Sequence, residues 1–164
     1  MPTIDEVMDL RPAIEEDIRS YLTAQNISAF TRQNAPENFQ LVLPRVEIKA
    51  QIGGVEGHRF LCPDGQIRYD VWYFNLALMC CTEPENIEAD NLLQNQFVAM
   101  VRGFASTMAQ NAYGDLVNFP NHVIAEPLKD AGTNETLKAD DNVEYSTLLF
   151  EGKIAIRQDV WPNN

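Results

Sequence analysis

The stretch IRYDVWYFNLALMCCT, residues 67–82, gives the strongest strand signal in the chain. Its side chains alternate between two faces with a period of two residues, which is typical of a β-strand. One face carries Ile67, Tyr69, Val71 and Tyr73, and the other carries Trp72, Phe74, Leu76 and Leu78. Both faces are apolar along the second half, so we predict a central strand that is covered on both sides.

A second two-faced strand precedes this one, in PRVEIKAQIGG at residues 44–54. Its apolar and polar residues alternate strictly, again with a period of two. The glycine-rich segments GGVEG, residues 53–57, and CPDG, residues 62–65, follow it. Both are typical of turns, so we expect a short excursion around His58 and Phe60 between the two strands.

Two helices are predicted, at about residues 10–24 and 87–112. The first has apolar residues at helical spacing, and Pro12 suits its first turn. The polar segment 26–39 after it is expected to be a connection. The second helix carries a broad apolar stripe: Leu92, Leu93, Phe97, Met100, Val101, Phe104 and Met108. This stripe covers the sheet or forms an oligomer contact, and its different edges can do both. Gly103 lowers helix propensity and permits close packing.

The rest of the chain adds two strands. Residues 120–128 suggest a short strand near an edge, because Pro127 lacks a ladder donor. Residues 129–142 are expected to be a polar loop. The segment VEYSTLLFEGKIAIR, residues 143–157, is the last strand, with a bulge or turn expected at Gly152.

The predicted order is therefore helix, strand, strand, helix, strand, strand. Consecutive strands without an intervening helix usually pair antiparallel. We predict one α+β domain over residues 1–164, with an antiparallel sheet and two main helices packed mostly on one face.

The excess of acidic over basic residues argues against some classes of binding partner. The chain of 164 residues has 12 Lys and Arg against 24 Asp and Glu, a net charge of −12. This charge repels phosphate, which argues against a general grip on nucleic acid and against binding to anionic membranes. It is compatible with an acidic surface past which DNA slides without sticking.

The cysteines and the N-terminus point to a reducing compartment. The three cysteines include one adjacent pair, which is a poor disulfide framework. The first residues lack the basic and apolar regions of a signal peptide. The longest apolar run, LALMCC, is too short to span a bilayer. We therefore expect a protein made in the cytoplasm.

No pattern predicts catalysis or a cofactor. His58 and Cys62 with Cys80 or Cys81 would make a poor zinc set, because only one short ligand spacing is present and His122 lies far along the chain. No signature places a nucleophile beside a base, so scattered structural residues are the favoured interpretation. We expect no enzyme activity, no metal and no cofactor.

Two further patterns have plain structural interpretations. Asp140 and Asp141 lack the regularly spaced ligands of a hard-cation loop. The aromatic stretch YDVWYF could stack on bases, but Asp70 interrupts it and only Arg68 flanks it. Core packing of a central strand is favoured.

The order of three stretches resembles the tail terminator or tail completion proteins of long-tailed bacteriophages. These stretches are LPRVEIKAQIGGVEGHRF, residues 43–60; IRYDVWYFNLALMCCTEPENIEADNLLQNQFVAMVRGF, residues 67–104; and VEYSTLLFEGKIAIRQDVWP, residues 143–162. They resemble the first strand with its long turn, the central strand with the helix after it, and the closing strand. The similarity covers most of residues 1–160, and each stretch is a strand or helix pattern rather than a chemical signature.

The resemblance implies a ring, usually a hexamer, on the last ring of the tail tube. Such a ring ends tube polymerisation and presents a surface to a head or neck connector, while DNA passes through its channel without specific binding. The implied partners are the tail tube protein and the connector. The implied location is the head-proximal end of the virion tail.

The interface residues are hypotheses. We expect the loop from Gly53 to Gly65, with Gly54, His58 and Arg59, to face the channel or the tube. Residues 130–142 are expected on the other face. The closing strand could pair at a sheet edge, or place Trp161 against a neighbouring subunit.

Three alternatives remain open. The first is a neck or head-completion connector, which would join the portal instead of the tube. The second is a small-molecule-binding α+β domain whose pocket is lined by Trp72, Tyr73 and His58. The third is a nucleic-acid binder, which the charge disfavours.

Overall fold

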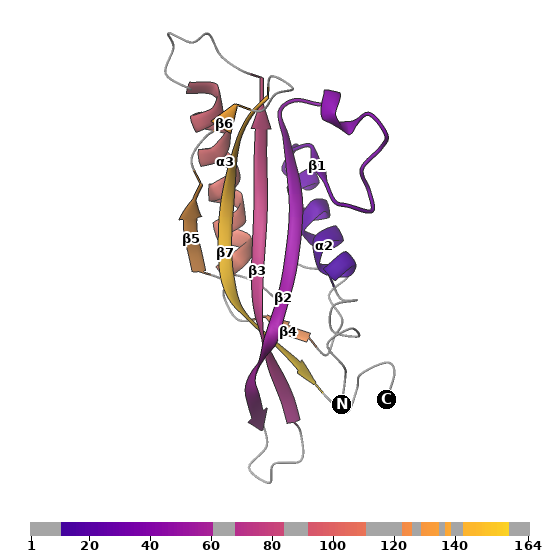
Figure 1. Ribbon diagram of the computed structural model, residues 1–164, viewed down its shortest axis with the longest axis vertical. Helices are drawn as coiled ribbons and strands as arrows, with labels where there is room; N and C mark the ends of the chain where they lie inside the picture. Colours follow the sequence, from indigo (N-terminus) through magenta and orange to yellow (C-terminus); the bar gives the residue numbers. More distant parts are fainter. Residues whose placement is uncertain are drawn as a thin grey trace.

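The computed structural model shows two helices and a mainly antiparallel sheet, which confirms the predicted α+β class (Figure 1). It describes residues 11–60, 68–83, 92–110, 123–125, 129–134, 137–138 and 143–157. Both main helices lie behind the sheet in this view, so they cover the same face, as predicted.

The described part of the chain contains ten elements of secondary structure. They are α2 (Arg11–Ala24), β1 (Ala29–Phe30), the 3-10 helix η1 (Phe39–Leu41), β2 (Arg45–Phe60), β3 (Arg68–Thr82), α3 (Leu92–Gln110), β4 (Val123–Ala125), β5 (Lys129–Thr133), β6 (Leu137–Lys138) and β7 (Glu144–Arg157).

The closing strand β7 lies inside the sheet. The order is β1-β2-β3-β7-β4, and β5 and β6 also pair with β7. Of these pairs only β1 and β2 run parallel. Both sides of β7 are therefore paired within the chain, so a closing strand at a sheet edge was wrong. The bulge or turn at Gly152 is also absent from the β3–β7 ladder, where Gly152 pairs with Phe74 without a register shift.

The glycine-rich segment predicted as a turn continues strand β2. Ile52 pairs with Phe74 and Val55 pairs with Trp72, so two glycines, Gly53 and Gly54, oppose the single residue Tyr73. This arrangement is a β-bulge, which bends and twists a strand without ending it. A Cβ on Gly53 would lie 3.3 Å from Cβ of Tyr73, so the close approach of the strands favours glycine there.

Two segments predicted as loops contain short strands. Strand β1 lies in the expected connection over residues 26–39, helix η1 begins at the end of that connection, and β5 and β6 lie in the expected polar loop over residues 129–142. Their few, mostly polar residues carry almost no periodic signal. Their pairing comes from β2 and β7, which offer unpaired ladder groups along their edges.

The hydrophobic core lies between the sheet and the two helices. Helix α2 contributes Ile14, Ile18 and Leu22 and helix α3 contributes Phe97, Val101 and Ala105, all buried. From β3 the same core receives Trp72, Phe74, Leu76, Leu78 and Cys80. The opposite face of β3 is buried at its two ends, at Val71 and Cys81, but is open between them, where Tyr73 is 49% exposed. The predicted central position of this strand is confirmed, whereas the prediction that both its faces are covered was wrong.

Candidate interaction surfaces

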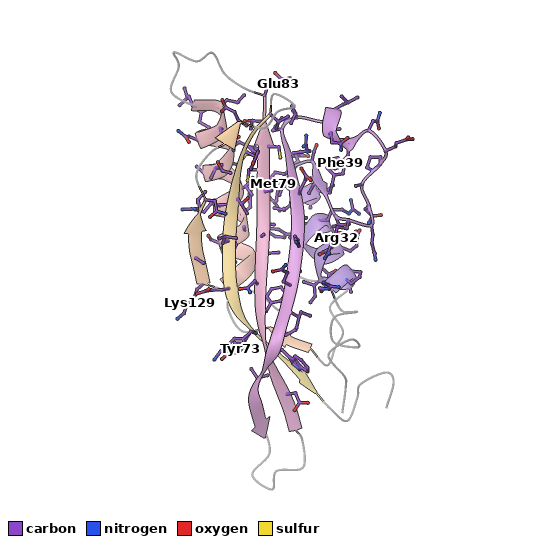
Figure 2. The ribbon with its side chains drawn as sticks, in the orientation of Figure 1. Arg32, Phe39, Tyr73, Met79, Glu83 and Lys129 are labelled. Carbon is purple, nitrogen blue, oxygen red and sulfur yellow. The ribbon has the colours of Figure 1, made fainter. Side chains whose placement is uncertain are left out.

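The sheet has one open face, which we call the open sheet face. Strand alternation puts every second residue of β2, β3 and β7 on the side away from the helices. The half-buried or exposed residues of the open sheet face include Glu47, Lys49, Gln51, Tyr73, Asn75, Ala77, Met79, Tyr145, Thr147, Leu149, Glu151 and Lys153. Figure 2 shows Tyr73 toward one end of β3 and Met79 toward the other.

The open sheet face is hollowed in two adjoining places. The first hollow, of about 350 Å³, is lined by Lys49, Gln51, Asn75, Leu76, Ala77, Ala131, Leu149, Phe150 and Glu151. The second, of about 490 Å³, is lined by Tyr73, Phe74, Asn75, Lys129, Glu151, Gly152 and Lys153. Because Asn75 and Glu151 line both, the two hollows form one shallow trough across β3 and β7.

The trough is locally basic, unlike the chain as a whole. Three lysines, Lys49, Lys129 and Lys153, line it against the single acid Glu151. The Nζ atom of Lys153 lies 5.9 Å from the ring centroid of Tyr73, within cation–π range. The trough can therefore accept an apolar or acidic surface, while the chain carries a net charge of −12.

The outward side of α3 forms a second uncovered surface, which we call the α3 outer face. Its exposed residues are Leu92, Leu93, Asn95, Gln96, Ala99, Met100, Gly103 and Thr107. None of them is charged. The single charged residue of this 19-residue helix, Arg102, lies 3.4 Å from Asp130 of β5 through its Nε atom. A helix that faces solvent ordinarily carries charges on its outer side, so this surface is unusual.

Helix α2 holds the outer edge of β2 through a buried carboxylate. Oε1 of Glu15 accepts hydrogen bonds from the backbone N–H of Ala50, at 3.0 Å, and from Nη2 of Arg32, at 2.7 Å. Strand β1 pairs with β2 only at Val46 and Glu47. The Glu15 side chain therefore satisfies an edge donor beyond the end of β1, which makes that part of the edge less open to another strand.

The outward side of α2 is charged. Glu16 and Arg19 form an ion pair, in which Nε of Arg19 lies 2.8 Å from Oε2 of Glu16. The hydrogen bond from Arg19 lowers the pKa of Glu16, an effect that burial opposes and that Asn34 reinforces. The same hydrogen bond raises the pKa of Arg19. The two helices thus cover one sheet face but present different outer surfaces.

A buried polar network ties α3 to the sheet. Gln94 is fully buried, and its Nε2 donates to the Cys80 carbonyl at 3.0 Å and to Oγ of Ser146 at 3.1 Å. Its Oε1 accepts a hydrogen bond from the Thr82 hydroxyl. Because both ends of the amide are paired, this network positions α3 over β3 and β7 without leaving the buried amide of Gln94 unsatisfied.

The two described cysteines, Cys80 and Cys81, are buried residues of β3. They point to opposite faces of the strand. Burial, and then the neighbouring Cys81, raise the pKa of Cys80 to about 12, so its thiol stays protonated near neutral pH. Within the described ranges no three His, Cys, Asp or Glu side chains come together as metal ligands. Cys62 and His122 lie outside those ranges.

The predicted interface residues have different outcomes. Gly53 and Gly54 lie in β2 at the bulge beside Tyr73, not in a loop. The backbone of His58 pairs with Asp70, and that of Arg59 pairs with Tyr69, so both also belong to β2. Trp161 lies outside the described residues, as do the aspartates at 140 and 141.

Of the residues predicted to line a ligand pocket, Trp72 and Tyr73 lie on opposite faces of β3, and the side chain of His58 lies outside the described part. Trp72 is buried in the core under the helices, whereas Tyr73 is exposed on the open sheet face. Adjacent strand residues face opposite sides, so these two cannot line one pocket. Tyr73 lines the trough instead.

Sequence reasoning missed the lysines of the trough, and it anticipated an uncovered edge of the α3 apolar stripe at Leu92, Leu93 and Met100 but not the absence of charge there. Lys129 and Lys153 are 24 positions apart in the chain and come together through the pairing of β5 with β7, where Lys129 lies opposite Glu151. Nothing in the sequence signals that pairing. The uncharged outer side of α3 was detectable, because one charge in 19 residues is rare in a chain that is 22% charged.

A comparison with known protein families finds no family model that matches the chain, and a comparison with curated proteins finds no match either. Among the helices of the described part, none is both long and apolar enough to cross a bilayer.

Proposed function

We propose that this protein is a structural virion protein that caps the tail tube of a long-tailed bacteriophage as a ring. It would end polymerisation of the tube and provide the attachment surface for the head or neck. The resemblance of residues 43–60, 67–104 and 143–162 to tail terminator proteins motivates this proposal, and the α+β fold is consistent with it.

The observation that carries the proposal is a pair of unlike uncovered surfaces on opposite layers of the molecule. The open sheet face is troughed and locally basic, and the α3 outer face is uncharged and carries exposed apolar residues. Head-to-tail contacts between identical subunits need two different complementary patches, and such contacts close into rings or extend into filaments. A chain that offers two such patches is suited to ring assembly.

The charge of the chain suits a channel for DNA. With 24 acidic against 12 basic residues, a ring of this protein would present mostly negative charge. Like charge keeps the phosphate backbone from adhering to the wall, so DNA would pass without specific binding. The protein would be made in the host cytoplasm and end at the head-proximal end of the tail.

The first test is native mass spectrometry over a concentration series, with negative-stain imaging of large species. The second is binding to purified tail tubes, imaged for density at one end of each tube. Closed rings of about six subunits, or a cap on tube ends, would support the proposal. A protein that assembles only on its template stays monomeric in solution, so the experiment with tail tubes is the decisive test of the proposal. A protein that leaves tube ends bare and tube length unchanged would refute it.

A neck or head-completion connector would share the same two surfaces. The two assignments differ only in the partner, so the same imaging with purified connector complexes separates them. Binding to connectors but not to tube ends would move the protein to the neck.

A small-molecule-binding role has one observation in its favour, the hollow of about 490 Å³ beside Tyr73. A ligand there would face Lys129, Lys153 and Glu151. A thermal-shift screen against carboxylates and phosphates tests it, with Lys153→Ala as the control. A ligand that stabilises the parent chain but not this variant would support this alternative.

A further inference from the structure

The α3 outer face is built to be buried. Burying a charged side chain is expensive, and the cores of protein interfaces are accordingly poor in charge. Helix α2, which covers the same sheet face, carries the Glu16–Arg19 ion pair on its outward side. Helix α3 carries none there, and Met100 is 45% exposed. A partner could therefore cover the α3 outer face without desolvating a charge.

Gly103 adds an independent observation. It lies in the interior of α3, where glycine lowers helix stability relative to alanine. An added Cβ would meet no atom within 4 Å, so nothing inside the described subunit needs a glycine here. A glycine on an exposed helix face that its own fold does not require suits close approach by another molecule.

The open sheet face offers a matching surface on a second copy. Ala77 and Leu149 line the trough on the central strands, and Lys49 and Lys129 line it on the strands to either side. Its local positive charge would offset part of the repulsion between two chains that each carry −12. Helix α3 has 19 residues and is about 28 Å long. Strand β3 has 15 residues and spans about 50 Å, so the helix fits within the length of the sheet.

We propose that the α3 outer face of one copy packs into the trough on the open sheet face of the next copy, with Met100 over Ala77 and Leu149 and with Gly103 allowing close approach. This inference rests on the proposed ring and names its subunit contact. Each α3 would then lie between two sheets, its own and its neighbour's. The two surfaces differ, so the contact is head-to-tail and can close into a ring.

The first test is site-directed cross-linking. Met100→Cys and Ala77→Cys are each made in a Cys62→Ser background, with tags of different mass, mixed at assembling concentration and treated with a short bismaleimide. Native Cys80 and Cys81 are buried, and the background chain without added cysteines controls for their reaction. We expect a mixed dimer that contains both tags. Linkage of Met100→Cys only to itself, or no linkage, would overturn the inference.

The second test compares two substitutions of Gly103, one expected to stabilise the isolated chain and one expected to weaken association. Gly103→Ala should raise the Tm of the isolated chain by about 2 °C, because the site is open and alanine favours helix. Gly103→Gln should weaken association by about tenfold or more, because its side chain blocks the close approach. Thr23→Gln, at an exposed position of α2, is the matched control and should leave association unchanged.

The outcomes separate this inference from the proposed function. Rings or tube caps that form equally well with Gly103→Gln, without the mixed cross-link, would overturn the subunit contact and leave the ring intact. A parent chain that associates neither with itself nor with tube ends would overturn both.

Discussion

The two faces of the central sheet differ in burial. Leu148 and Leu149 are neighbours in β7, yet Leu148 is fully buried under the helices and Leu149 is half-buried on the open sheet face. The helix side holds the whole of the hydrophobic core cluster. One face therefore stabilises the subunit, while the other keeps apolar and lysine side chains in reach of a partner.

The largest expected effect is the difference in unfolding free energy between alanine variants of Leu148 and Leu149. Leu148→Ala should lower the free energy of unfolding by about 3 kcal/mol, because it leaves a cavity in a closed core. Leu149→Ala should cost less than about 1 kcal/mol in the isolated chain. Urea denaturation at a concentration where the chain is monomeric measures both. Equal losses for the two variants would mean that the open sheet face is covered within the subunit after all.

The core side of the sheet could be anticipated from the sequence, and the open side could not. The alternation of Trp72, Phe74 and Leu76 predicts one buried face whatever the topology. Apolar residues at Ala77 and Met79 suggested a second cover, but burial of that face depends on whether any helix remains to cover it. The chain places both α2 and α3 on the same side.

The missed elements share a cause. Gly53 and Gly54 carry the composition of a turn, and the strand passes through them because long ladders on both sides of the bulge outweigh the local preference. Strand β5 has no apolar periodicity and is recruited by the edge of β7. Both depend on partners distant in sequence. Local pattern alone therefore could not locate the trough that these strands frame.

The second prediction sharpens the comparison by testing a polar part of the covered face. Gln94→Leu keeps the volume but removes the hydrogen bonds that Gln94 makes with the Cys80 carbonyl and with the hydroxyl groups of Thr82 and Ser146. We expect a loss of about 2 kcal/mol in the free energy of unfolding. Gln96→Leu, an exposed glutamine on the same helix, is the matched control and should change it by less than about 0.5 kcal/mol. Similar effects of the two variants would show that the buried network contributes nothing specific.

The third prediction concerns the pH dependence of stability that comes from Cys80, which lies on the covered face of the sheet. Burial raises the pKa of Cys80 from 9.0 to about 12, so the folded chain keeps a proton that the unfolded chain loses between these values. Stability should therefore be complete below pH 9 and fall as pH rises, by at most about 1.4 kcal/mol per pH unit from this group. Unfolding measured at about pH 8, 9 and 10 gives the slope.

Two cysteine variants check that assignment. Cys80→Ala should show a smaller loss of stability with rising pH than the parent chain, because the titrating thiol is gone. Cys81→Ala keeps that thiol and should retain most of the slope, less the part that Cys81 itself contributes to the shift. A slope unchanged by Cys80→Ala would assign it to other groups.

The smallest expected effect tests the outer surface of α2, the charged counterpart of the α3 outer face. Glu16→Gln removes the ion pair with Arg19 and should cost about 0.3–0.5 kcal/mol at neutral pH. The hydrogen bond from Arg19 holds the pKa of Glu16 below its ordinary 4.5. The contribution is therefore present above pH 4.5 and disappears as pH falls through the lower folded value.

A double-mutant cycle with Arg19→Gln, measured by urea denaturation at neutral and at acidic pH, isolates this pair. The coupling energy should be small at neutral pH, near zero in acid, and reduced by salt. Such a result would mean that the charges on α2 keep that side soluble rather than hold the fold. A coupling above about 2 kcal/mol would instead make the pair structural. The charges on α2 would then be explained by their effect on folding. The absence of charge on the α3 outer face would in that case no longer be an argument for a subunit contact.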